Sequence, residues 1–211
     1  MTAEPPRDCP LCPRLVAYRA ENRALAPDWW NGPAPSFGDP DARLLVMGLA
    51  PGRTGANRTG RPFTGDYAGD LLYGTLAKFG FARGTYGADP NDGFTLVGAM
   101  VSNAVRCAPP ENKPTPAEIA TCRPFLAARI AALPKLRVII ALGSIAHESV
   151  LRAEGMKPAA AKFAHEAVTD LPSGRTLVSS YHCSRYNTQT GRLTTAMFEA
   201  AFARAAAIAN G

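Results

Sequence analysis

The chain has 211 residues, of which 46% are hydrophobic and 19% charged, and these proportions are typical of one globular domain. The longest strongly apolar run, residues 138–142, is far too short to cross a bilayer, and residues 1–8 lack the apolar stretch of a signal peptide, so we expect a cytoplasmic protein with no membrane partner. The formal net charge of +6 favours an acidic partner such as DNA, although the positive residues are spread along the chain and form no basic tail.

The first part of the chain predicts an irregular arm followed by a strand. Residues 1–42 are rich in Pro, Asn, Asp and Trp, which indicates a wrapping segment with one short helix near residues 14–23. Residues 44–48 have the length and flanks of a buried strand, and a loop rich in Gly and Pro follows to residue 65. The next helix is expected over residues 66–79.

The rest of the chain alternates strands with helices. A strand lies within residues 94–105, and an amphipathic helix is predicted over residues 116–133, with Thr115 as its N-cap, Pro116 at its first position and Pro124 as a kink-forming residue. The remaining elements are a buried strand over 137–142, a helix over 144–153, a strand over 176–180, a polar loop and a final Ala-rich helix over 193–208.

This alternation predicts a single α/β domain over residues 1–211, with three layers, α/β/α, and a central, mainly parallel sheet of four strands. In such folds the functional site lies at the carboxyl ends of the strands. Polar segments follow three of the predicted strands, at residues 48–66, at Asn103 and at residues 182–189. We therefore expect these three segments to converge on one edge of the sheet.

Four of the five cysteines have a spacing typical of a metal centre. Cys9 and Cys12 form a Cys-x2-Cys motif in the N-terminal arm, and Cys107 and Cys122 supply two more thiolates. Four thiolates bind either zinc or a [4Fe–4S] cluster, and the spacing does not choose between them. The alternative is that Cys107 and Cys122 are buried apolar side chains. Cys183 is left over, and we interpret it as structural.

The loop after the first strand, residues 48–66, is rich in glycine. Its glycines are not spaced as in a P-loop, and the chain has no Gly-x-Gly-x-x-Gly fingerprint, so the loop does not indicate a nucleotide-binding enzyme. Phe63 stands where an aromatic ring can stack on a base, although an anchor packed into the core explains it equally well. Asp66 lies where the next helix begins, so its carboxylate is either a catalytic group or one that favours the helix dipole.

The loop after the last strand, residues 181–192, carries a candidate catalytic histidine. His182 lies at the predicted carboxyl end of that strand. Arg185, Tyr186 and Arg192 are interleaved beyond it, a pattern that suits a loop entering a DNA groove while its arginines hold phosphates. The alternative is a solvated surface loop.

These segments resemble the family 5 (type b) uracil-DNA glycosylases over nearly the whole chain. The resemblance is carried by Gly-Leu-Ala-Pro-Gly at 48–52, Asn-Arg-Thr-Gly-Arg-Pro-Phe-Thr-Gly-Asp at 57–66, Val-Arg-Cys-Ala-Pro-Pro at 105–110, Asn-Lys-Pro-Thr-Pro at 112–116, Tyr-His at 181–182 and Asn-Thr-Gln-Thr-Gly-Arg at 187–192. The family implies a base excision repair enzyme that removes uracil from DNA, with hypoxanthine and xanthine as further bases.

The resemblance also implies roles for matching residues. Asp66 stands at the position of the catalytic acidic residue, Phe63 at that of the aromatic which stacks on the flipped base, and His182 at that of the histidine which stabilises charge on the leaving base. Asn103 stands where related families read the uracil edge. The cysteine layout is shared with the family 4 enzymes, which carry a [4Fe–4S] cluster, so the resemblance favours this cluster over zinc at Cys9, Cys12, Cys107 and Cys122.

The chemistry of base excision fits these assignments. A base within a duplex must be flipped into a pocket, and cleavage of its N-glycosidic bond leaves positive charge on the sugar and negative charge on the base. We assign Asp66 to the sugar and to the attacking water, and His182 to the base, helped by backbone N–H groups around Ala50 and Gly52.

The remaining polar residues of the two loops are assigned to DNA, in double- or single-stranded form: Arg58, Arg61, Ser184, Arg185, Asn187, Gln189 and Arg192. We expect a monomer. The alternative function is a non-catalytic DNA-binding protein with an iron–sulfur or zinc centre, and only Asp66 and His182 argue against it.

Overall fold

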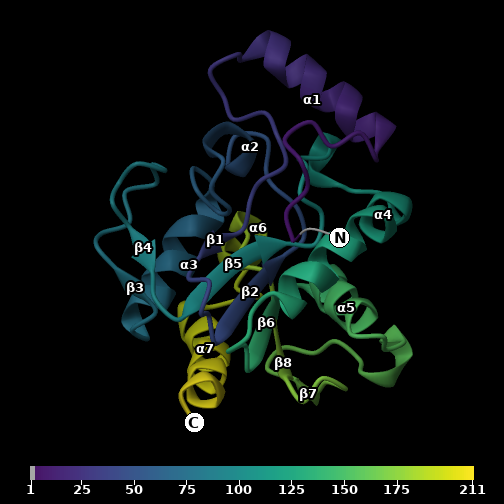
Figure 1. The fold of residues 1–211 in the computed structure, drawn as a ribbon. Helices are drawn as coiled ribbons and strands as arrows, with labels where there is room; N and C mark the ends of the chain where they lie inside the picture. Colours follow the sequence, from purple (N-terminus) through teal and green to yellow (C-terminus); the bar gives the residue numbers. More distant parts are fainter. Residues whose placement is uncertain (1–2) are drawn as a thin grey trace.

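The computed structural model describes residues 3–211. A six-stranded sheet forms the middle of the molecule (Figure 1), with the strand order β1-β5-β2-β6-β8-β7. Its strands are β1 (Phe37–Gly38), β2 (Leu44–Gly48), β5 (Ala99–Asn103), β6 (Val138–Leu142), β7 (Val168–Asp170) and β8 (Thr176–Ser180). Two further strands, β3 (Ala82–Arg83) and β4 (Thr95–Leu96), pair with each other in a separate antiparallel ribbon.

The four inner strands are parallel and correspond to the four that the sequence predicts. β2 lies between β5 and β6, and β8 pairs with the far side of β6, all in parallel register. The four-stranded prediction is wrong at the edges, where β1 and β7 add antiparallel strands. These strands have only two and three residues, too few for a periodic pattern to reveal them.

Helices cover both faces of the sheet, which confirms the three-layer α/β/α architecture. α3 (Tyr67–Lys78) and α7 (Thr195–Asn210) cover one face, and α4 (Pro116–Ala131) and α5 (Ser144–Ala153) cover the other. The other helices are α1 (Pro13–Leu25), α2 (Ala56–Thr59) and α6 (Arg185–Gln189), with short 3-10 turns at Pro110–Asn112 and Pro158–Ala160. None of the helices within residues 3–211 has the length and apolarity to span a membrane.

Successive residues of β2 enter two different cores. Leu44 and Val46 pack in the core that contains α3 and α7, whereas Leu45 and Met47 pack in the core that contains α4 and α5. All four side chains are fully buried. A strand covered on both faces needs an unbroken apolar run, which is why this segment is recognisable from the sequence.

The N-terminus of α4 has the cap that the sequence predicts. Glu118 N donates to Thr115 Oγ1 (3.2 Å), and Thr115 N donates to Glu118 Oε2 (2.7 Å), which completes a capping box. The helix continues through Pro124 to Ala131. Glu118 also accepts from Arg14 in α1, with 2.7 Å between Nη2 and Oε2. The same carboxylate therefore caps α4 and attaches the N-terminal arm to it.

The polar loop expected after β8 contains a short helix, α6. Ser184 is its N-cap, and its Oγ accepts from the backbone N–H of Asn187 (3.3 Å). None of the five residues of α6 is buried. A single turn without an apolar face gives no helical periodicity, so the sequence did not predict it.

We predict that Thr115→Ala lowers the free energy of unfolding by about 1 kcal/mol, because it removes the side-chain acceptor of the capping box. Urea unfolding followed by circular dichroism measures the change. Thr195→Ala, at an exposed position in the first turn of α7, serves as the control and should stay within about 0.5 kcal/mol of the parent. Equal stability of the two variants would contradict the capping role of Thr115.

Candidate active site

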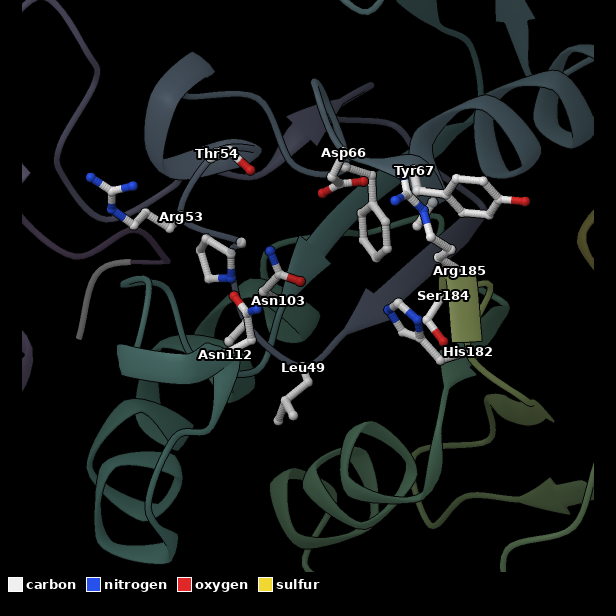
Figure 2. Close-up of a pocket in the computed structure, with 15 residues that line it drawn as sticks. Leu49, Arg53, Thr54, Asp66, Tyr67, Asn103, Asn112, His182, Ser184 and Arg185 are labelled. Carbon is white, nitrogen blue, oxygen red and sulfur yellow. The ribbon is translucent and has the colours of Figure 1, made fainter. Parts of the chain in front are cut away.

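A cavity of about 460 Å³ opens at the carboxyl ends of the inner strands. Its walls come from the loop after β2, the end of β5 and the loop after β8, so the predicted convergence of these three segments is confirmed (Figure 2). The lining residues are Leu49, Ala50, Pro51, Gly52, Arg53, Thr54, Phe63, Asp66, Tyr67, Ala68, Asn103, Asn112, His182, Ser184 and Arg185. All six predicted catalytic and base-binding residues are among them.

The inner end of the cavity depends on a glycine at the end of β2. Gly48 pairs with Asn103 in the parallel ladder. A Cβ atom on Gly48 would lie 2.4 Å from Asn103 Oδ1 and 2.7 Å from Phe63 Cζ. No real side chain tolerates such distances, so only glycine lets the amide and the aromatic ring approach each other here.

The Asp66 carboxylate faces the cavity without serving as a helix cap. Asp66 occupies the N-cap position of α3, but its side chain makes no capping hydrogen bond. Its Oδ1 atom is buried and has no hydrogen-bond partner within residues 3–211. Burial raises the pKa of Asp66, an effect that the backbone amides of Ala68 and Gly69 oppose. The amides of the first turn of α3 thus favour the ionised carboxylate, as the helix-dipole interpretation expects, and a ligand in the cavity would supply the partner that Oδ1 lacks.

Space for the Asp66 carboxylate is provided by a second glycine. A Cβ atom on Gly55 would lie 2.6 Å from Asp66 Oδ2. Any larger residue at position 55 would therefore displace the carboxylate from the cavity. This close approach links the Gly-rich loop to the first turn of α3.

His182 reaches the cavity from the loop after β8. Its ring stacks against Phe63, with 5.9 Å between ring centroids and an interplanar angle of 27°. Burial lowers the pKa of His182 to about 4, so the imidazole is neutral at pH 7 and keeps one N–H donor. Asn187 Nδ2 donates to the backbone oxygen of His182 (2.8 Å) and fixes this point of the loop.

Phe63 packs into the core, as the anchor interpretation expects, and it also lines the cavity. The side chain is buried in the core that contains α3 and α7. Its backbone has a φ of 53°, in the left-handed region that non-glycine residues rarely adopt. Such strain persists only where the surroundings determine the conformation, and it is frequent at functional sites.

Asn103 ends β5 inside the cavity. The residue is 3% exposed, and its side chain lines the cavity. An amide offers a donor and an acceptor side by side, which matches the alternating groups on the edge of a pyrimidine or purine base.

Asn112 and Tyr67 also line the cavity, although neither residue was assigned a role from the sequence. Asn112 belongs to the 112–116 motif and has a left-handed φ of 57°. Tyr67 is exposed, and Arg185 lies over its ring at 5.2 Å. Their only sequence signals were the motif itself and adjacency to Asp66.

Four of the predicted DNA-binding residues lie on the surface: Arg58, Arg185, Gln189 and Arg192. Ser184 and Asn187 are partly buried and bond within the α6 segment.

The assignment of Arg61 to DNA does not fit its position in the structure. Its side chain is 5% exposed and forms an ion pair with Asp92, with 2.8 Å between Nη2 and Oδ2. A guanidinium enclosed in this way cannot reach a phosphate, so Arg61 is corrected from a DNA-binding to an internal residue.

The four cysteines predicted to bind a metal lie close together beside α4. They line one small cavity and, with Leu15, Val105 and Phe125, form one packed cluster: Cys9, Cys12, Cys107 and Cys122. None of them is in a disulfide. Over residues 3–211, no three His, Cys, Asp or Glu side chains are placed to hold a single metal ion.

Cys183 lies apart from this cluster. It is fully buried, and its Sγ donates to the backbone oxygen of Ala68 (3.6 Å). Its position agrees with a structural role.

Comparison with known proteins gives a consistent result. The family model described as the uracil DNA glycosylase superfamily matches residues 35–206. A type-5 uracil-DNA glycosylase of Thermus thermophilus is 50% identical over 195 residues, which cover 90% of this chain and 89% of that protein. Proteins of the same description from Mycobacterium leprae and Pyrobaculum aerophilum are 42% and 38% identical, with 96% of this chain and 92% and 90% of theirs covered.

We predict that the His182 imidazole stays neutral down to about pH 5, because burial lowers its pKa from 6.5 to about 4. The unfolded chain then binds the extra proton, so the contribution of His182 to stability is complete above pH 6.5 and is lost as the pH falls toward 4. NMR titration of the histidine ring signals, assigned with a His182→Asn variant, measures the midpoint. A midpoint near 6.5 would show that the ring is solvated.

Proposed function

The chain belongs to the type-5 uracil-DNA glycosylases of the uracil DNA glycosylase superfamily, and from this premise we propose that it excises uracil from DNA through Asp66 and His182. One observation carries the assignment: a buried carboxylate oxygen of Asp66 without a partner in the described chain faces the same cavity as the neutral imidazole of His182 and the amide of Asn103. The reaction is hydrolysis of an N-glycosyl bond in DNA repair.

The cavity suits a base that has left the helix. Bases in a duplex are out of reach of side chains, so the deoxyuridine must be everted into a pocket. Phe63 offers its ring for stacking, and Asn103 offers its amide to the edge of the base. A volume of about 460 Å³ also accommodates a purine, and we include hypoxanthine and xanthine among the proposed substrates.

Asp66 acts on the sugar side of the bond. As the bond between C1′ and the base nitrogen breaks, its electron pair leaves with the base and C1′ gains oxocarbenium character. The carboxylate stabilises this cation and orients a water molecule, whose oxygen bonds to C1′ and whose proton passes to Asp66. Its raised pKa, caused by burial, makes the ionised group a better proton acceptor than an exposed aspartate.

His182 acts on the departing base. Negative charge develops on the oxygen atoms of uracil, and a donor already in place lowers the barrier without reorganisation. A neutral imidazole suits this task because it donates one N–H, and its burial in the cavity costs less than that of a charged ring. Backbone N–H groups around Ala50 and Gly52 are assigned to the same charge.

We assign DNA binding to the exposed side chains of Arg58, Arg185, Gln189 and Arg192 and to the partly buried Ser184 and Asn187. We assign the arginines to phosphates, where binding is independent of sequence and weakens with salt. We propose a monomeric enzyme that acts in the cytoplasm, since one chain supplies every residue assigned to the reaction.

We further propose that Cys9, Cys12, Cys107 and Cys122 hold a [4Fe–4S] cluster, with zinc as the alternative. A cluster fits their surroundings, because four thiolates bring negative charge and two buried arginines lie beside them. Arg19 Nη1 lies 3.9 Å from Cys107 Sγ, and Arg106 lines the same cavity. When bound, the cluster would join the N-terminal arm to the loop after β5 and to α4, which is a structural role.

We predict that Asp66→Asn lowers the single-turnover rate of uracil excision by about 10²-fold or more, because the amide can neither accept the proton of water nor stabilise the sugar cation. Binding of uracil-containing DNA, measured by gel shift, should stay close to that of the parent. Asp170→Asn, on the edge strand β7, is the control. Parental excision by Asp66→Asn would overturn the catalytic assignment, and a parent without excision would favour a non-catalytic DNA-binding protein.

We predict that the purified protein is brown and contains iron and acid-labile sulfide in equal amounts, about four atoms of each per chain. Cys107→Ser should reduce the visible absorption strongly, because one thiolate ligand is lost, whereas Cys183→Ala should leave it unchanged. A colourless parent protein that contains one equivalent of zinc would contradict the iron–sulfur proposal and support its alternative.

A further inference from the structure

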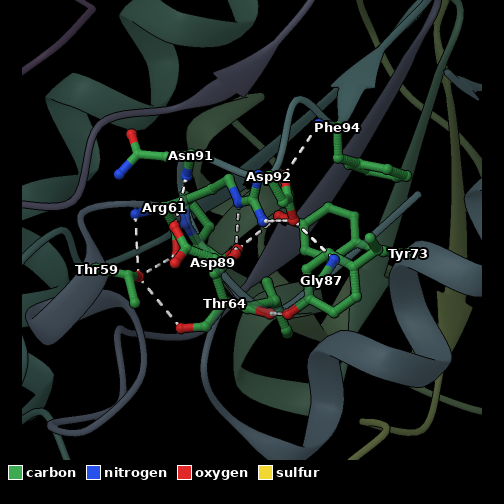
Figure 3. Close-up of polar contacts among 12 residues, drawn as sticks. Thr59, Arg61, Thr64, Tyr73, Gly87, Asp89, Asn91, Asp92 and Phe94 are labelled. Atoms are coloured by element: carbon green, nitrogen blue, oxygen red, sulfur yellow. Dashed lines mark hydrogen bonds and ion pairs between the residues drawn. The ribbon is translucent and has the colours of Figure 1, made fainter. Parts of the chain in front are cut away.

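The loop that carries Phe63 and Asp66 is held from outside by the segment between β3 and β4, residues 84–94 (Figure 3). Arg61 of the loop and Asp92 of this segment form a forked ion pair, with 2.8 Å for both Nη1–Oδ1 and Nη2–Oδ2. The two side chains are only 5% and 8% exposed. Two parallel charge-assisted hydrogen bonds fix orientation as well as distance.

The remaining hydrogen-bonding groups of the pair are also used. Arg61 Nε donates to Thr64 Oγ1 (2.7 Å), which places the guanidinium inside its own loop. Asp92 accepts from the backbone N–H groups of Gly87 (2.8 Å) and Phe94 (2.9 Å), which ties the carboxylate to both ends of its own segment. Arg61 is therefore fixed to a side chain of its own loop and Asp92 to the backbone of its own segment, and the ion pair joins the loop to the segment.

Two tyrosines hold the carbonyl groups of the same loop. Tyr86, also in residues 84–94, donates to the backbone oxygen of Phe63 (3.0 Å). Tyr73 of α3 donates to the backbone oxygen of Pro62. The Arg61 guanidinium lies over both rings, at 5.4 Å from Tyr86 and 5.8 Å from Tyr73. The Arg61 guanidinium thus packs against the two tyrosines whose hydroxyl groups bind the backbone at Pro62 and Phe63, and Phe63 is the residue with the left-handed backbone.

We propose that Arg61 and Asp92 are positioning residues for base excision, which hold Phe63 in its strained conformation and thereby set the direction of Asp66. This inference rests on the proposed function, because it concerns the geometry of that reaction. Arg61, Thr64 and Asp66 are separated by only a few residues, so a shift of the loop would move the stacking ring and the carboxylate together.

The stability of the fold does not by itself explain why Arg61 and Asp92 form a buried ion pair. Two charges lose their hydration on burial, and replacing a buried ion pair by apolar side chains of similar size often leaves stability unchanged or raises it. Apolar side chains would not reproduce the fork or the bond to Thr64. A positioning role therefore predicts that stability and catalysis respond differently when both partners are replaced together.

The test is the double variant Arg61→Met/Asp92→Leu, compared with the parent and with Asp89→Asn, an exposed change in the same segment. Thermal unfolding and excision kinetics are measured for each. We expect the double variant to unfold near the parental temperature and to lose about 10²-fold in kcat with a much smaller change in KM, because a displacement of about 1 Å at reacting groups has such an effect. Asp89→Asn should match the parent.

Thr64→Val is the second variant and decides the matter if the double variant does not fold. It removes the acceptor of Arg61 Nε, together with the bond from Thr64 Oγ1 to the backbone oxygen of Pro62, without a change of charge. We expect a loss of about tenfold in kcat in a folded protein. A parental kcat in the folded double variant, or in Thr64→Val, overturns the positioning role. A parent that excises no uracil overturns the proposed function instead, so the two failures are distinguishable.

Discussion

The carboxylate of Asp66 is held in a buried position where its Oδ1 atom has no hydrogen-bond partner within residues 3–211. An unsatisfied buried acceptor costs about 1–3 kcal/mol, and more when it is charged. The backbone amides of Ala68 and Gly69 in the first turn of α3 favour the ionised carboxylate, but they leave Oδ1 without a partner. Gly55 leaves room for the carboxylate, and the loop before it is fixed by bonds to neighbouring segments. The rest of the site depends on this carboxylate being held in the cavity with one oxygen atom left for a ligand.

The sheet and the burial of the site then divide the chemistry between two sides of one cavity. Parallel pairing of β5, β2, β6 and β8 brings the ends of all four strands to one edge, so residues over a hundred positions apart become neighbours. Burial raises the pKa of Asp66 and lowers that of His182. The same low-dielectric surroundings therefore make the Asp66 carboxylate accept a proton more readily and keep the His182 imidazole neutral. Together the two side chains match the opposite charges that a breaking N-glycosyl bond develops.

Much of this arrangement could be predicted from the sequence, for identifiable reasons. β2 and β6 are unbroken apolar runs, and α4 carries a Thr115 cap, so local patterns revealed them, and topology brought Asp66, Asn103 and His182 together. The edge strands and α6 are too short for any periodic signal. Arg61 was misread because a polar loop suggests exposure, whereas its partner lies 31 residues away and becomes adjacent only through the fold. No local pattern could indicate that pairing.

The three walls of the cavity differ in what fixes them. The loop that follows β2 is joined to residues 84–94 by the Arg61–Asp92 pair, and the loop that follows β5 adjoins the cysteine cluster at the start of α4. The wall that carries His182 is fixed by a contact between residues close in the sequence: Asn187 of α6 donates to the backbone oxygen of His182. Arg185 belongs to the same single turn and is exposed at the rim. In the proposed complex, Arg185 at a phosphate and His182 at the base would therefore be connected through one short helix, which would link contact with the DNA backbone to the placement of the donor.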